Sequence, residues 1–405
     1  MLKSYFSKGV PPGFPLASVV VLLLCFAGNL TGQSTLDSLL AQIERNNQTL
    51  RAEGQRVDAS AKEFQTGIWL SDPQLSYDFL KGFPSSAGNQ NDLIVMQPFD
   101  YPTAYKRRRE LANLKTGQLT VESKSLRQEI LLEAKLNSLQ LIFLNKRRAE
   151  LNRRLAAAQE FLTNYQKKFD ARDATALDLN KARHQLLNLQ TELNLLNAET
   201  GALQVHLTEL NGGVPILITD TLYPALAGIP VFETLEQTIE SNDPTLQFLQ
   251  LQKQVGEAQV SLAKALALPK MELGYHYQGI LGQQFHGFHL GLSIPLWEHK
   301  NRVAQQQLQT VYYAGQIAAH RTEHFFTIKR LYEKYQTLNA SLEAYRENLR
   351  SLNNMELLNK ALQAGQITAL EYFVEQSLLY ESYDRLLELE REVAKAAAEL
   401  YKFAL

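Results

Sequence analysis

The sequence predicts a mainly helical protein with transmembrane β-structure, built from two copies of one unit. Three observations predict this fold: a repeated peptide, strand-like segments at matching positions, and very long helical patterns. The repeated peptide reads IERNNQTL at 43–50 and IESNDPTL at 239–246, so the two copies are 196 residues apart in a chain of 405. We interpret it as the same helix start written twice, which indicates a duplicated fold.

Other landmarks recur at nearly the same distance. Pro73 and Pro269 differ by 196 positions, and Pro98 and Pro295 differ by 197. The tripeptide Thr-Ala-Leu occurs at 175–177 and again at 368–370, a distance of 193. These landmarks predict the following organisation: a signal peptide at 1–32, a first repeat at 33–211 with a β-hairpin at 73–99, a linker at 212–231, and a second repeat at 232–405 with a β-hairpin at 270–295.

The N-terminus has the features of an export signal. Lys3 and Lys8 precede an apolar run at 16–27, and small and polar residues follow, so we expect cleavage near Gly32. The only cysteine, Cys25, lies in this run, and the processed chain would therefore contain no disulfide. A membrane anchor is the alternative, although a spanning helix needs about 20 apolar residues. The formal net charge of -1 gives no field that would attract nucleic acid.

Four segments are typical of strands. Residues 73–80, 270–277 and 287–294 alternate apolar and polar side chains, and residues 92–99 do so less regularly. Successive side chains of a strand point to opposite faces, so each strand would have one apolar face and one polar face. Pro98 and Pro295 end the second strand of each pair.

Long helical patterns fill the rest of the chain. From Thr103 to Phe169 there is no proline and one glycine, and leucine and alanine recur at three- and four-residue steps. Such a helix would be roughly 100 Å long. We also expect helices at 35–67, from about 176 to Asn211, at 232–267, at 297–364, and from a break at Gly365 to about 405.

Four strands cannot close a cylinder. An open sheet edge in a bilayer leaves backbone groups unpaired, at several kcal/mol each, which predicts closure by association of several chains. Three chains would contribute twelve strands, enough for an aqueous lumen. The expected assembly is a 12-stranded trimeric β-barrel continued by a long α-helical tunnel.

The element order resembles that of the TolC-type outer-membrane efflux proteins. The segments VMQPFDYPTAYKRR and LSIPLWEHKNR are similar to the strand-to-helix junctions of that family, and DATALDLNKAR and AGQITALEY are similar to its periplasmic turns. The paired glycines common at the family's junctions are absent here. The resemblance implies a homotrimer in the lipid of the outer membrane, with its helical tunnel in the periplasm. It would work with a periplasmic adaptor and an inner-membrane pump.

The implied function is that of an outer-membrane channel in a tripartite efflux or type I secretion system. It would be a passive duct, gated at its periplasmic end, that catalyses no reaction and needs no cofactor. No phosphate-binding glycine loop occurs, so energy would come from the partners. The alternative is a soluble periplasmic coiled-coil scaffold or adaptor, which would leave the apolar strand faces without a partner.

Acidic residues mark the expected gate. Asp170, Asp173, Asp178 and Glu371 lie in or beside the two turns, and Asp178 and Glu371 are equivalent by the repeat. A trimer would bring six such carboxylates near the narrowest point, an arrangement that favours cations. The alternative interpretation is that these carboxylates stabilise helix starts, where caps and the helix dipole favour them.

The remaining patterns carry weaker hypotheses. Histidines at 276, 286, 289 and 299 make metal efflux conceivable, with His276 and His289 on polar strand faces and His286 in an outer loop. His320 to His324 matches the H-x-x-E-H zinc-peptidase pattern, although an interhelical role is favoured.

The basic clusters at 106–109, 145–148 and 153–154 are interpreted mostly as solvated helix faces, and the alternative is that they face lipid head groups or an adaptor. Trp297 suits a membrane-interface aromatic, or a residue that packs the junction.

Overall fold

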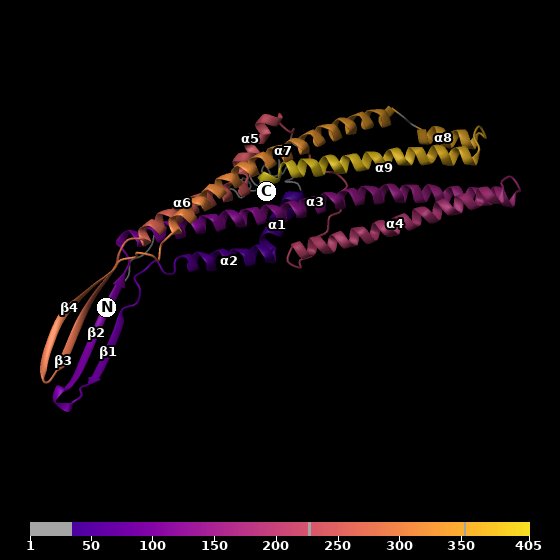
Figure 1. Ribbon diagram of the computed structural model, residues 1–405. Coiled ribbons are helices and arrows are strands. Elements are labelled where there is room, and N and C mark those ends of the chain that lie inside the picture. Colours follow the sequence, from indigo (N-terminus) through magenta and orange to yellow (C-terminus); the bar gives the residue numbers. More distant parts are fainter. Residues whose placement is uncertain (1–34, 226–227, 352–353) are drawn as a thin grey trace, which may run out of the picture.

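The computed structural model is a long rod with a four-stranded sheet at one end and two helical hairpins that extend to the other end (Figure 1). It describes residues 35–225, 228–351 and 354–405. The predicted signal peptide, with Cys25, lies outside the described residues.

Two halves of the chain repeat the same order of elements, which confirms the duplicated fold. The first half contains α1 (Thr35–Asn46), α2 (Gln48–Phe64), β1 (Gln74–Lys81), β2 (Asn89–Phe99), α3 (Pro102–Asp170) and α4 (Ala176–Leu210). The second half contains α5 (Phe232–Asn242), α6 (Pro244–Leu266), β3 (Lys270–Ile280), β4 (Gln283–Ser293), α7 (Arg302–Ser351), α8 (Asn354–Gln363) and α9 (Ala369–Leu400). Short 3₁₀ turns, Ser85–Ala87 and Lys402–Ala404, complete the chain.

The repeated peptide is a junction between two helices, and not the start of one. The helix expected at 35–67 is broken at Asn47 into α1 and α2, and the one expected at 232–267 is broken at Asp243 into α5 and α6. Both residues have extended backbone conformations, and the side-chain oxygen of each accepts a hydrogen bond from the next helix. Asparagine and aspartate are preferred at this capping position because their side chains satisfy a backbone N–H group that the helix leaves unpaired.

Other boundaries differ by a few residues. The helix expected at 297–364 begins at Arg302 and is described as α7 and α8, and the last helix ends at Leu400. Strands β2 and β4 begin at Asn89 and Gln283, earlier than the alternating pattern indicated. Their polar ends continue the sheet because β3 offers a partner there, as in the pairs Gln90–Ile280 and Ile280–Gln283.

The sheet runs β1-β2-β3-β4, and every neighbouring pair is antiparallel. Leu75 lies opposite Val95, Val95 opposite Tyr275, and Tyr275 opposite Phe288, so these side chains share one face. That face is apolar and solvent-exposed, with Leu75 at 71% and Phe288 at 89%. The register places His276 and His289 on the opposite, polar face, as expected.

The helices are packed along their leucine seams. Helix α3 has 69 residues, which corresponds to about 100 Å, and its buried positions include Leu141, Leu144 and Leu151. Ile216 and Ile218 of the linker pack on this core. Gly212 adopts a left-handed backbone with φ of 64° and lies so close to the carbonyl oxygen of Asn46 that a Cβ there would be 2.3 Å away.

Within the described part of the chain, no helix combines the length and the apolar character that crossing a membrane requires.

Candidate functional site

The two turns lie at the end of the hairpins that is far from the sheet (Figure 1), and they have the same construction. Arg172 and Gly365, equivalent at a distance of 193 residues, both have a φ of 67°. The amide that follows each of them reaches back to the preceding helix: Asp173 N donates to Lys168 O at 2.8 Å, and Gln366 N donates to Ala361 O at 2.9 Å. The repeat therefore extends to the backbone hydrogen bonds of the turns.

Asp178 and Glu371 both belong to capping boxes that open α4 and α9. The hydroxyl oxygen of Thr175 accepts from Asp178 N at 3.2 Å, and that of Thr368 accepts from Glu371 N at 3.3 Å. In return, Thr368 N donates to the Glu371 carboxylate at 2.8 Å. The hydrogen bonds from the backbone and the hydroxyl of Thr368 hold the pKa of Glu371 below its ordinary value. Both carboxylates are thus oriented at helix starts, and Glu371 is fully exposed.

The other two acidic residues of the predicted gate are exposed. Asp170 ends α3 and accepts a hydrogen bond from Gln166 at 3.0 Å, and Asp173 lies in the turn. Lys181 lies 4.0 Å from Asp178 on the same helix. One chain therefore places four carboxylates around the hairpin ends.

Two contacts hold the first hairpin (α3–α4) against the second (α8–α9) near this end, and a third joins the two helices of the second hairpin. Gln185 of α4 donates to the buried Gln376 of α9 at 2.7 Å. The ring of Phe161 in α3 stacks on that of Tyr372 in α9, with centroids 5.3 Å apart. Tyr372 also donates to Asn359 of α8 at 2.9 Å, and burial raises the pKa of its hydroxyl to about 12.

Arg154 makes a further contact between the two hairpins, and we call these contacts between hairpins ties. The interpretation of its basic cluster as a solvated face is wrong for this residue, which is buried. Only 4% of its side chain is exposed, and it pairs with Glu150 and with Asp384 of α9, both at 2.8 Å. Its guanidinium also lies 4.2 Å from the ring centroid of Tyr380. This burial is hard to predict from the sequence, because Asp384 lies 230 residues away from Arg154.

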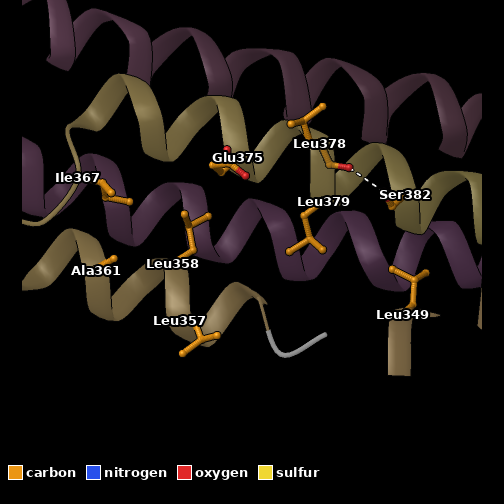
Figure 2. A pocket seen from close by; sticks show the side chains of 9 residues that line it. All are labelled: Leu349, Leu357, Leu358, Ala361, Ile367, Glu375, Leu378, Leu379 and Ser382. Atoms are coloured by element: carbon orange, nitrogen blue, oxygen red, sulfur yellow. Dashed lines mark hydrogen bonds between the residues drawn. The ribbon is translucent and has the colours of Figure 1, made fainter. Parts of the chain in front are cut away.

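The two helices of the second hairpin, α8 and α9, are not packed closely along their whole length. A groove of about 450 Å³ opens between α8 and α9, and Figure 2 shows leucines from both helices around it. Leu357 is 62% exposed and Leu378 is 54% exposed. Ser382 donates to Leu378 O at 2.9 Å, which leaves the groove lining mainly apolar.

Trp297 lies at the other end of the rod, in the segment between β4 and α7, where it is 81% exposed. Its position four residues after the end of β4 agrees with a membrane-interface role, which stays a prediction.

The histidines do not form a metal centre in the described residues, where no group of three or more His, Cys, Asp or Glu side chains could hold an ion. His320 and His324 of the H-x-x-E-H pattern both face Asp243, at 2.6 Å and 3.8 Å, and thus contact the junction of α5 and α6. The expectation that His286 lies in an outer loop is wrong: it lies on β4 and bonds to the Tyr275 hydroxyl.

Solved structures share this fold over most of the chain. CusC matches with a TM-score of 0.77 and 13% identity over 91% of both chains. The outer membrane protein VceC of Vibrio cholerae matches with a TM-score of 0.71 and 14% identity, covering 91% of this chain and 94% of its own. The Campylobacter jejuni CmeC outer membrane channel has a TM-score of 0.70 and 14% identity, with coverages of 91% and 85%.

A match to a family of known proteins is found for the second repeat. A search of curated proteins finds no match. Residues 235–404 match the model of the family described as "Outer membrane efflux protein". The matched residues make up most of the second repeat, so this part of the chain is similar to the outer membrane efflux protein family, as the TolC-type resemblance predicted.

Proposed function

We propose that this protein is the outer-membrane channel of a tripartite efflux or type I secretion system, in which three copies form a passive duct that is closed at the hairpin ends. The family match carries the proposal. The protein would reside in the outer membrane with its hairpins in the periplasm. The matches give no support to the soluble scaffold. A periplasmic adaptor and an inner-membrane pump would supply the energy, as the family resemblance implies.

The isolated sheet has the properties of a fragment of a larger cylinder. Its apolar face is exposed, and β1 and β4 are free edges of a four-stranded sheet. In a bilayer such edges must pair, which three copies achieve with twelve strands. The same threefold arrangement sets six capped carboxylates, Asp178 and Glu371 from each copy, around the axis at the hairpin ends.

The gate would open by separating the second hairpin from the first. The contacts that must break include Gln185–Gln376, Phe161–Tyr372 and Arg154–Asp384. The open groove between α8 and α9 supports movement of the second hairpin, because a region with fewer buried apolar contacts opens at lower free energy.

The gate residues are tested with a charge-neutral double variant, Asp178→Asn with Glu371→Gln. Alanine at these positions would remove the helix caps, whereas asparagine and glutamine retain hydrogen-bonding groups in the caps. In planar bilayers we expect weaker cation selectivity than for the wild type, because a carboxylate ring favours cations. Glu381→Gln, which removes an exposed charge farther along α9, is the matched control and should leave selectivity unchanged.

Different results test the gate residues and the assignment of the protein as a channel. Equal cation selectivity of the double variant and the wild type would show that other residues form the constriction. If the purified wild-type protein produces no conductance steps in any bilayer, the channel assignment itself fails.

A further inference from the structure

We infer that β4 of one copy pairs antiparallel with β1 of the next copy, with Leu292 opposite Phe79. This inference rests on the proposed function, because it describes how the copies join. It fixes a register between chains that the structure of one chain does not contain, and it follows from the internal repeat.

The two hairpins of the chain have equivalent strand registers. In the first hairpin Leu75 lies opposite Val95, and in the second Met271 lies opposite Leu292. The step from Leu75 to Met271 is 196 residues, and the step from Val95 to Leu292 is 197. These are the distances that separate Pro73 from Pro269 and Pro98 from Pro295. Sequence landmarks and strand pairing therefore define the same equivalence.

The pairing between the repeats can then be transferred to the pairing between copies. Within the chain, β2 of the first repeat pairs with β3 of the second, and Val95 lies opposite Tyr275. In a ring, the next equivalent seam joins β4, the counterpart of β2, to β1 of the following copy, the counterpart of β3. Val95 corresponds to Leu292, and Tyr275 corresponds to Phe79, which gives the proposed pair.

The chemistry of the side chains agrees with this register, although they were not used to derive it. The same transfer places Ile294 beside Tyr77, which extends the apolar face, and Ser293 beside Asp78 on the polar face. All four apolar side chains of these pairs are more than half exposed in the single chain, at 56% for Phe79, 62% for Tyr77, 62% for Leu292 and 61% for Ile294. A slip of one residue would place apolar side chains opposite polar ones.

Helix α2, which lies near the edge strand β1, has one side without a packing partner in the single chain. Helix α6 packs against both α3 and α7 and buries residues such as Val255 and Ala263. Its counterpart α2 packs mainly against α3, and none of its residues, all of which are described, is buried. The repeat assigns the open face of α2 to α7 of the adjoining copy, where Leu308, Val311 and Tyr312 are exposed at 70%, 68% and 57%.

Disulfide trapping tests the register. A full-length chain carrying Phe79→Cys and Leu292→Cys is purified in detergent, oxidised mildly, and resolved on a denaturing gel without reductant. Within one chain these positions lie on opposite edges of the sheet, three strand spacings or roughly 14 Å across it at about 4.8 Å per strand, and they are further offset along the strands. A disulfide must therefore join two copies. We expect covalent dimers and trimers in more than half of the protein, and none from either single-cysteine variant.

Two shifted pairs make the test specific. Phe79→Cys combined with Leu290→Cys, or with Ile294→Cys, places the thiols one step of two residues from the proposed register, about 7 Å along the strand. If either shifted pair cross-links better than the proposed pair, the register is wrong, whereas conductance would show that the channel assignment stands. If no pair cross-links in a conducting protein, the seam between β1 and β4 is wrong. If the double-cysteine proteins do not cross-link and the wild-type protein does not conduct, the proposed function is overturned as well.

Discussion

Asn47 and Asp243, 196 residues apart, perform the same task in the two halves of the chain. Asn47 Oδ1 accepts from Leu50 N at 3.0 Å, and Asp243 Oδ1 accepts from Thr245 N at 2.9 Å. Their second contacts differ: the Asn47 amide donates to Leu210 O of α4, whereas the Asp243 carboxylate accepts from His320 of α7. The duplicated junction is thus fastened to a different helix in each half.

The first prediction concerns this junction. Asp243→Ala removes the cap of α6 and the partner of His320, and we expect a loss of about 2 kcal/mol in stability, at the upper end for a lost cap. Asp243→Asn recreates the capping residue of the first half and should cost less than half as much. Thermal unfolding in detergent compares the two. Equal destabilisation by alanine and asparagine would show that the contact between the Asp243 carboxylate and His320 dominates, and not the cap.

The sequence predicted the parts of the fold that depend on local periodicity. Alternating residues located the strands, and the repeat predicted which segments are equivalent. It misread the junctions at Asn47 and Asp243, because a single-residue break between two amphipathic helices leaves the apolar period almost undisturbed. The capping residue itself was the available signal, since asparagine or aspartate is preferred just before a helix.

The second prediction concerns the pH dependence of the gate. The pKa of Glu371 lies below its ordinary value of 4.5 because the backbone N–H and the hydroxyl of Thr368 stabilise the carboxylate. A depressed pKa means that the cap stabilises the protein above pH 4.5 and that this contribution is lost as the pH falls through the lower, folded-state pKa. We therefore expect cation selectivity, measured as the reversal potential in a salt gradient, to be constant from about pH 7 to pH 5 and to decline only below about pH 4.5.

The Glu371→Gln variant provides the control for that measurement, because it should lack the acidic decline attributed to this residue. A decline of wild-type selectivity centred near pH 6 would contradict the prediction and would indicate histidine instead.

The third prediction concerns the network that joins α8 and α9 to α4. The Tyr372 hydroxyl donates to Asn359 and accepts from Gln376 at 3.2 Å, and Gln376 accepts from Gln185. Tyr372→Phe leaves two polar groups without this partner, which should cost the closed arrangement about 1 kcal/mol. That energy corresponds to roughly a fivefold rise in the open fraction. Single-channel recording of the purified protein measures it.

Tyr383→Phe is the matched control on the same helix, because the Tyr383 hydroxyl makes no hydrogen bond with the residues that the structure describes. An open fraction that rises equally in both variants would attribute the effect to the general loss of a hydroxyl, and the proposed tie would be discarded.

The ties of the candidate site could not be predicted from the sequence, because they are made between distant segments. Arg154 belongs to a basic cluster, and such clusters are commonly solvated. It can be buried only because Glu150, one turn away, and Asp384, in the other repeat, both face it. Gln376 is similar: a glutamine on a seam position gave no indication of the Gln185 side chain that satisfies it.

The last prediction concerns His206, which joins the end of α4 to α3. Its ring nitrogens lie 2.9 Å from Glu133 and 3.2 Å from Glu209, and the hydrogen bond with Glu133 is the main cause that raises its pKa above the ordinary value of 6.5. A raised pKa means that the stabilisation is complete below pH 6.5 and is lost as the pH rises through the higher, folded-state pKa.

Because the His206, Glu133 and Glu209 side chains are exposed, the interaction of His206 with the two carboxylates is worth about 0.5 kcal/mol. The melting temperature of His206→Gln should therefore fall about 1 °C below that of the wild type at pH 5.5, and the two should coincide at about pH 8.5. Glu133→Gln should reproduce this pattern, since it removes the principal partner. A melting difference that grows toward alkaline pH would have the wrong sign and would exclude a protonated His206 as the stabilising species.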